Sequence, residues 1–147
     1  MNHEHFIRIA MEEAEIAVET SNAPFGAIAI DENGAVIARD HDRVKEQMDP
    51  TAHAEINAIR FLCKQRQSTK LPNVIFYTTS EPCPTCLSAM IKAQVKAVYY
   101  GTKTETDASL PISAEWLALQ SKKYVIEVHG GILAEECLRQ REVMKNV

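Results

Sequence analysis

Residues 74–86 read Val74-Ile75-Phe76-Tyr77-Thr78-Thr79-Ser80-Glu81-Pro82-Cys83-Pro84-Thr85-Cys86, an apolar run followed by a polar segment and two closely spaced cysteines. Its first four residues form a continuous apolar run, which is typical of a central strand covered on both faces. Pro84 suits the first turn of a helix, because an amide at that position would lack an intrahelical partner anyway. The stretch therefore predicts a buried strand, a short connection and a helix that begins at about residue 84.

Apolar periodicity on either side of this stretch predicts the remaining elements. Helices are expected at residues 3–20, 51–65, 84–93 and 113–120 and after residue 131, and strands at 25–30, 35–39, 74–77, 96–100 and 124–128. Residues 43–50 are expected to form a loop.

The connections between the expected strands indicate their directions. Asn33-Gly34 between two apolar runs is a strong hairpin signal, so the first two strands are expected to be antiparallel. A helix between the last two strands favours a parallel pair, because parallel neighbours need a crossover connection. The sequence thus predicts an α/β fold, a three-layer α/β/α sandwich around a mixed five-stranded sheet.

Length and composition limit the class of protein. A chain of 147 residues predicts a single domain over residues 1–147, and 46% hydrophobic with 24% charged residues is typical of a folded protein. Charged residues near the N-terminus and the lack of a long apolar run favour a cytoplasmic protein without a membrane partner. The net charge of −4 does not favour nucleic acid as a partner, because such binding relies on Lys and Arg.

Two short motifs about thirty residues apart supply three soft metal ligands and one carboxylate. Thr51-Ala52-His53-Ala54-Glu55 contains a histidine and a glutamate, and Pro82-Cys83-Pro84-Thr85-Cys86 contains two cysteines. A catalytic zinc site keeps three protein ligands and leaves the fourth position for water. We therefore expect His53, Cys83 and Cys86 to bind Zn²⁺ where two helices begin, with Glu55 close enough to reach the water.

Each of these residues also has a simpler interpretation. His53 could cap a helix or lie in the core, Glu55 could be an ordinary first-turn carboxylate, and the cysteines could form a redox pair or half of a structural zinc site. A structural site needs a fourth ligand, and the remaining histidines and cysteines show no paired spacing. A thioredoxin-like pair would be expected after the first strand. The catalytic zinc site is the favoured interpretation.

These motifs, together with Pro24-Phe25-Gly26-Ala27 and Asp49-Pro50, resemble the cytidine deaminase superfamily, in particular its guanine deaminases and tRNA adenosine deaminases. The resemblance covers nearly the whole chain. It implies a cytidine deaminase-like fold and a hydrolytic deaminase that replaces the exocyclic amine of a purine-type nucleobase or nucleoside with oxygen and releases ammonia. It also implies a homodimer, with Glu55 as the proton carrier, the Ala54 amide against the ring and the Glu81 carbonyl facing the amino group.

The choice of substrate depends on residues outside the two motifs. Relatives usually carry Asn eleven positions before the zinc histidine, where this chain has Asp42, and an ionised carboxylate only accepts hydrogen bonds. Either Asp42 is an exposed loop residue without a substrate role, or it selects a ring that presents N–H donors, as guanine does. Phe25 could stack on a flat substrate or belong to the core.

Three functions stay open at this point. Guanine deamination is favoured, and Asp107 is a candidate for the acidic residue that guanine deaminases carry in the corresponding segment, within the loop of residues 101–120. A tRNA-specific adenosine deaminase is the alternative, with tRNA as a less favoured partner. A zinc-stabilised binding protein without activity would be expected to have lost Glu55, which is present.

Overall fold

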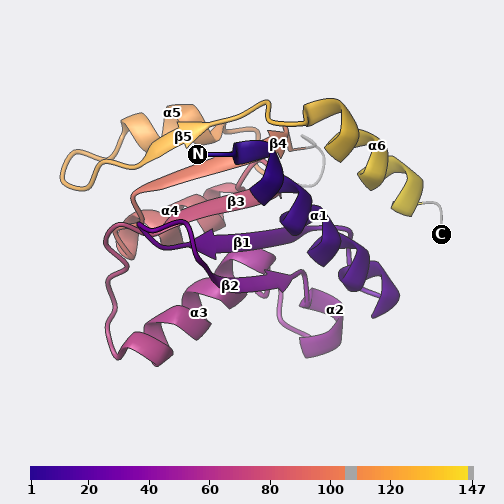
Figure 1. Ribbon diagram of the computed structural model, residues 1–147, viewed down its shortest axis with the longest axis horizontal. Helices are drawn as coiled ribbons and strands as arrows, with labels where there is room; N and C mark the ends of the chain where they lie inside the picture. The colour runs from indigo at the N-terminus through magenta and orange to yellow at the C-terminus, as the bar shows by residue number, and fades with distance from the viewer. Residues whose placement is uncertain (105–108, 146–147) are drawn as a thin grey trace.

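The computed structural model describes residues 1–104 and 109–145. Within them, one sheet has the strand order β2-β1-β3-β4-β5 (Figure 1). β1 is antiparallel to both β2 and β3, whereas β3, β4 and β5 are mutually parallel neighbours, so the predicted mixed five-stranded sheet is confirmed. The strands are β1 (Gly26–Ile30), β2 (Val36–His41), β3 (Ile75–Ser80), β4 (Ala97–Thr102) and β5 (Glu127–His129).

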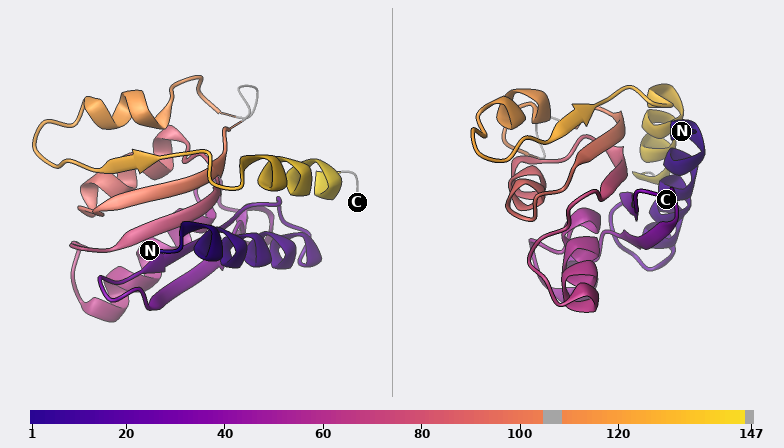
Figure 2. Two further views of the ribbon diagram at one scale, coloured as in Figure 1. Left: turned by 45° about the horizontal axis from the view of Figure 1, so that its top comes forward. Right: turned by 60° about the vertical axis from the view of Figure 1, so that its left-hand side comes forward.

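Helices cover both faces of the sheet and complete the predicted sandwich (Figure 2). α1 (His3–Glu19) and α6 (Ala134–Lys145) lie on one face, and α3 (Ala54–Arg66) and α4 (Pro84–Lys92) lie on the other. The short α5 (Ala114–Leu119) packs beside α4 and β5. Among the described residues, none of the helices combines the length and the hydropathy that a membrane-spanning segment needs.

The central strands divide their side chains between two cores. Phe76 packs with Leu62 of α3 and Leu87 of α4, whereas its neighbour Tyr77 packs with Ile7 of α1. Successive side chains of a strand point to opposite faces, and here both faces are covered. This arrangement explains why the sequence of β3 begins with a continuous apolar run rather than an alternating pattern.

Several element boundaries differ from the sequence-based prediction, and β3 continues to Ser80, three residues past its predicted end. The expected loop at residues 43–50 contains a one-turn helix, α2 (Val44–Gln47), whose first amide donates to the Asp42 side chain. α3 begins at Ala54 rather than at residue 51, because the Asp49 side chain binds the amide and hydroxyl of Thr51 in a turn. β5 is shorter and later than predicted, since only three of its residues pair with β4. The differences at α2 and α3 arise from local hydrogen bonds that periodicity does not report, whereas the bounds of β5 depend on its pairing with β4.

Candidate active site

Two helix N-termini bring the three predicted metal ligands together. His53 and Cys83 are the residues immediately before α3 and α4, and Cys86 lies in the first turn of α4. Nδ1 of His53 is 3.6 Å from Sγ of Cys83 and 3.3 Å from Sγ of Cys86. Tetrahedral zinc, with Zn–N of about 2.05 Å and Zn–S of about 2.3 Å, would place nitrogen and sulfur about 3.6 Å apart. The two nitrogen–sulfur distances are therefore close to those of a zinc site, and all three ligand atoms lie within 4.8 Å of one another.

The same three side chains strongly perturb one another. Hydrogen bonding with Cys86, and secondarily with His53, lowers the pKa of Cys83 to about 4. Hydrogen bonding to Cys83 raises the pKa of His53 to about 9. Zinc binds thiolates and a neutral imidazole. A bound zinc ion would therefore displace the protons that His53, Cys83 and Cys86 otherwise share through their hydrogen bonds. The N-terminus of α4 further favours negative charge on sulfur.

Glu55 lies beside this group without being part of it. It is in the first turn of α3, its residue is 8% exposed, and it borders a cavity of about 150 Å³ together with His53 and Cys83. Burial, and next the negative charge of Cys83, raise the pKa of Glu55 to about 7. A carboxyl group with a pKa near neutrality can both take up and release a proton during a reaction.

The sheet topology explains why so many segments meet at this cavity. β1 is antiparallel to β3 and to β2, so the start of β1 and the end of β2 lie at the same sheet edge as the carboxyl end of β3. Crevices outside the carboxyl ends of parallel strands are common ligand sites. Besides the three residues above, the cavity is lined by Phe25, Gly26, Asp42, Thr78, Thr79, Ser80, Glu81, Thr104 and Ser109.

Asp42 is a buried wall of the cavity. It is 5% exposed, so the interpretation as an exposed loop residue is wrong. Its amide donates to the carbonyl of Phe25, and its Oδ1 accepts from the amide of Val44 at 3.1 Å. Burial raises the pKa of Asp42 above its usual range, although the backbone hydrogen bonds oppose this. Its selective role towards substrate stays a prediction.

The other predicted substrate contacts differ in how they are placed. Phe25 is half-buried, lines the cavity and belongs to neither hydrophobic core. Ala54 is fully buried and does not line the cavity with its side chain, so a ring contact through its amide stays a prediction. Glu81 lines the cavity, but its carboxylate accepts hydrogen bonds from the amides of Thr104 and Ala114. Asp107 lies outside the described residues.

Sequence reasoning missed several cavity residues. Thr104 and Ser109 follow β4, and no local pattern marks them as part of a site. Thr78, Thr79 and Ser80 could have been found, because a polar run that follows an apolar one marks the end of a buried strand in a parallel sheet, where ligands bind.

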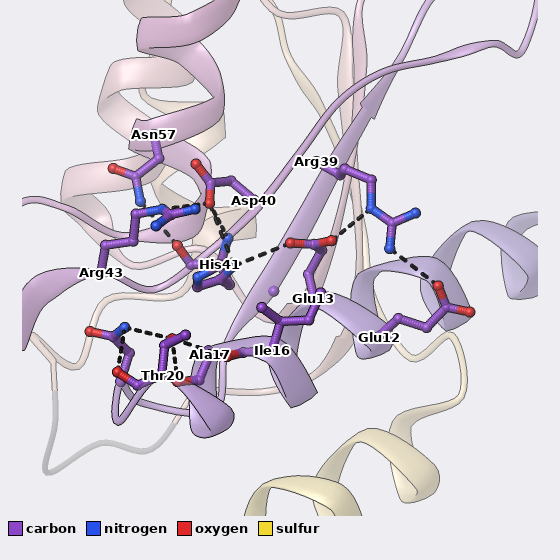
Figure 3. Close-up of polar contacts among 12 residues, drawn as sticks. Glu12, Glu13, Ile16, Ala17, Thr20, Arg39, Asp40, His41, Arg43 and Asn57 are labelled. Atoms are coloured by element: carbon purple, nitrogen blue, oxygen red, sulfur yellow. Dashed lines mark hydrogen bonds and ion pairs between the residues drawn. The ribbon is translucent and has the colours of Figure 1, made fainter. Parts of the chain in front are cut away.

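A second group of potential ligand atoms comprises Glu13, Asp40 and His41. Figure 3 shows the Glu13 carboxylate between Arg39, whose Nε donates at 2.6 Å, and His41, whose Nδ1 is 3.2 Å away. The Nε of Arg43 similarly donates to Asp40 at 2.8 Å. Arg39 and Arg43 already neutralise these two carboxylates. The group is therefore better described as a salt-bridge network between α1 and β2 than as a second metal site. This salt-bridge network holds the end of β2 directly before Asp42.

Comparisons with known proteins agree with this geometry. The family model of the cytidine and deoxycytidylate deaminase zinc-binding region matches residues 1–102. The chain is 44% identical to guanine deaminase of Bacillus subtilis over 74% of its own length and 69% of that protein. It is 33% identical to tRNA-specific adenosine deaminase of Agrobacterium fabrum over 90% of this chain and 86% of that one.

A solved structure from work on A-to-I editing by tRNA:A34 deaminases at the wobble position superposes with a TM-score of 0.78 at 32% identity, covering 92% of this chain and 98% of the other. The sequence match, the shared fold and the converging His53, Cys83 and Cys86 are mutually consistent. The chain therefore belongs to the cytidine and deoxycytidylate deaminase family and is a zinc-binding deaminase, a hydrolase of C–N bonds.

Proposed function

We propose that this deaminase acts on a free amino-substituted nucleobase, with guanine as the first candidate. The observation that carries the proposal is the Asp42 carboxyl group in the cavity wall, where a side-chain amide would offer a donor as well as an acceptor. When ionised, Asp42 favours a ring that presents N–H groups, and guanine presents several. The similarity to guanine deaminase of Bacillus subtilis supports the same substrate.

In this proposal, His53, Cys83 and Cys86 hold the metal and Glu55 moves protons. Bound zinc would polarise a water molecule for attack on the ring carbon that carries the amine. Glu55 takes one proton from this water and passes it to the ring nitrogen. It then takes the remaining proton from the hydroxyl group now bonded to the ring carbon and passes it to the amine, which leaves as ammonia while the carbon keeps a carbonyl oxygen. Its buried position keeps the carboxyl group near neutral pKa, so it can act as base and then as acid.

The remaining contacts orient the ring. Phe25 stacks on the flat substrate, since it lines the cavity and is not used in either core. The amide of Ala54 and the carbonyl of Glu81 contact the ring and its amino group. Asp42 binds the N–H groups of the ring.

A tRNA adenosine substrate is the second candidate. It is supported by the match to the Agrobacterium fabrum enzyme, which extends over more of this chain than the guanine deaminase match does. The net charge of −4 weighs against it, because tRNA binding depends on positive charge to neutralise phosphates.

Ammonia release from guanine, adenine, cytosine and their nucleosides, compared with inosine formation in tRNA, distinguishes these candidates. We expect guanine to have the highest kcat/KM among the small substrates and tRNA to yield no inosine. Inosine formation in tRNA without turnover of any free base would refute the proposal and support the alternative.

Replacing Glu55 tests its assignment as proton carrier. We expect Glu55→Ala to retain about one zinc per chain and to lose turnover by at least on the order of a hundredfold, because general acid–base catalysis is removed. Zinc content is measured by metal analysis of the purified variant. His53→Ala is the matched control and should lose both zinc and turnover. Loss of zinc from Glu55→Ala would instead mean that Glu55 supports the metal site.

Replacing Asp42 tests the specificity argument. Asp42→Asn keeps the size of the side chain and the acceptor for the Val44 amide, but adds a donor. We expect the kcat/KM ratio of guanine to adenine to fall in this variant. An unchanged ratio across the base panel would remove Asp42 from substrate selection.

A further inference from the structure

One peptide group at the cavity wall is held at both ends by buried charged side chains. The carbonyl of Lys103 accepts a hydrogen bond from Nη1 of Arg141 at 3.1 Å, and the amide of the next residue, Thr104, donates to Oε1 of Glu81 at 3.1 Å. Arg141 is 5% exposed and Glu81 is 7% exposed. A guanidinium at the oxygen end and a carboxylate at the N–H end both match the direction of the peptide dipole.

The two charged side chains come from different parts of the fold. Arg141 belongs to α6, on the face of the sheet covered by α1, whereas Glu81 directly follows β3. Nη1 of Arg141 also donates to Oγ of Ser80 at 3.1 Å, and Oε2 of Glu81 also accepts from the amide of Ala114, the first residue of α5. The pair thus connects the ends of β3 and β4 with α5 and α6.

Three of these residues, Ser80, Glu81 and Thr104, line the cavity, whereas Arg141 does not. Hydrogen bonds with one charged partner are roughly twice as strong as those between neutral groups, and burial protects them from exchange with water. The position of Thr104 in the cavity wall is therefore set by a side chain that lies outside the cavity lining.

We infer that Arg141, acting together with Glu81 on the Lys103–Thr104 peptide, is a positioning residue that sets the substrate-facing wall of the cavity at Thr104. Substrate binding by this deaminase then depends on α6, although the described part of that helix supplies no residue to the cavity lining. The effect on substrate binding rests on the proposed function. The immobilisation of the Lys103–Thr104 peptide by Arg141 and Glu81 is independent of it.

The kinetic test uses wild type and α6 variants with the base of highest turnover from the panel above. Arg141→Met removes the charge at similar length, and we expect KM to rise on the order of tenfold with kcat within about threefold, since a displaced wall weakens binding and leaves the metal group intact. Arg141→Lys keeps the charge and should recover part of the loss. Arg139→Met makes the same substitution at an exposed site of α6 and should behave as wild type.

A second measurement does not depend on turnover. Hydrogen exchange at the Thr104 amide should speed up at least on the order of tenfold in Arg141→Met, while amides of β1 stay protected as in wild type. Glu81→Gln should also speed up hydrogen exchange at the Thr104 amide. In the double variant Glu81→Gln/Arg141→Met, exchange should be no faster than in the faster of the two single variants, because both side chains act on one peptide.

An unchanged KM with unchanged Thr104 exchange in a folded Arg141→Met would overturn the inference, and so would strictly additive effects in the double variant. Reduced zinc content or a fall in kcat alone would also overturn it, since either would point to the metal group. If no base is turned over by wild type but Thr104 exchange still responds as expected, the proposed function fails and the immobilised peptide stands. Thermal unfolding of each variant identifies any that fail to fold, and Arg141→Lys then carries the exchange test.

Discussion

At the scale of single residues, Asp42 shows how burial changes what a carboxyl group offers. Its position in the chain identifies a departure from the pattern of related deaminases, but only the folded chain shows that the side chain is buried in the cavity wall. Burial raises its pKa because the charged form is less well solvated there than in water. At neutral pH, the burial of Asp42 therefore lowers the free energy of unfolding, although its carboxyl group has a proposed role in substrate specificity.

This destabilisation predicts a pH-dependent effect of Asp42→Asn on stability. With its folded pKa raised above the ordinary value of about 3.9, Asp42 stabilises the fold most below that value, and this contribution is lost as pH rises through the folded pKa. We therefore expect the unfolding free energy of Asp42→Asn, relative to that of wild type, to increase from pH 4 to pH 7. Urea denaturation at several pH values measures it.

Asp49 supplies a control of opposite sign. Hydrogen bonds from Thr51 lower the pKa of Asp49, so its contribution is present above the ordinary value and lost as pH falls. Asp49→Asn should become more destabilising relative to wild type as pH rises. Parallel curves for the two variants would contradict the assignment of the Asp42 shift to burial.

At the scale of elements, α1 and β1 approach so closely that Gly26 has no room for a side chain. A Cβ at this position would overlap the carbonyl oxygen of Ala10 and lie 2.6 Å from the amide nitrogen of Ala14. Both are backbone atoms of α1, which cannot move aside as a side chain can. The Gly26 amide also donates to Oγ1 of Thr79, so the close approach lies at the cavity edge.

We expect Gly26→Ala to destabilise the protein by about 3 kcal/mol, because overpacking forces a shift of helix or strand. Gly34→Ala is the control: a Cβ there meets nothing within 4 Å, although its φ of +82° makes the substitution cost about 1 kcal/mol. Chemical denaturation compares the two. Equal losses of unfolding free energy in the two variants would show that α1 can shift at little cost and that its close packing against Gly26 is unimportant.

At the scale of the whole molecule, the proposed zinc site joins two helices whose starts lie about thirty residues apart in the chain. α3 and α4 meet through His53, Cys83 and Cys86 at the edge of the sheet. Because a metal that binds the folded chain stabilises it by mass action, zinc should strengthen the entire fold and not only the cavity.

Removal of zinc with a chelator should therefore lower the thermal midpoint of wild type. Free zinc a thousandfold above its Kd would contribute about 4 kcal/mol. Glu55→Ala should respond to chelation as wild type does, whereas Cys86→Ser should already unfold at the lower temperature and show no response. A chelator-insensitive wild type would contradict zinc ligation by this group.

Much of the architecture follows from short-range patterns. The order of helices and strands, the hairpin at Gly34 and the helix start at Pro84 depend on periodicity and turn chemistry within about a dozen residues. The same holds for the pairing of His53 with Glu55 and of Cys83 with Cys86, since each pair is set by spacing along one helix start. The amino-acid sequence alone is therefore sufficient to predict these features.

The walls of the cavity cannot be predicted in this way. Burial of Asp42, the exclusion of a side chain at Gly26 and the meeting of Arg141 with the Lys103–Thr104 peptide each join segments far apart in the chain. Local pattern carries no information about such contacts, because they depend on how completed elements pack. Thus the chain's own motifs specify the chemistry of deamination, whereas the packing of the folded chain shapes the space into which a substrate must fit.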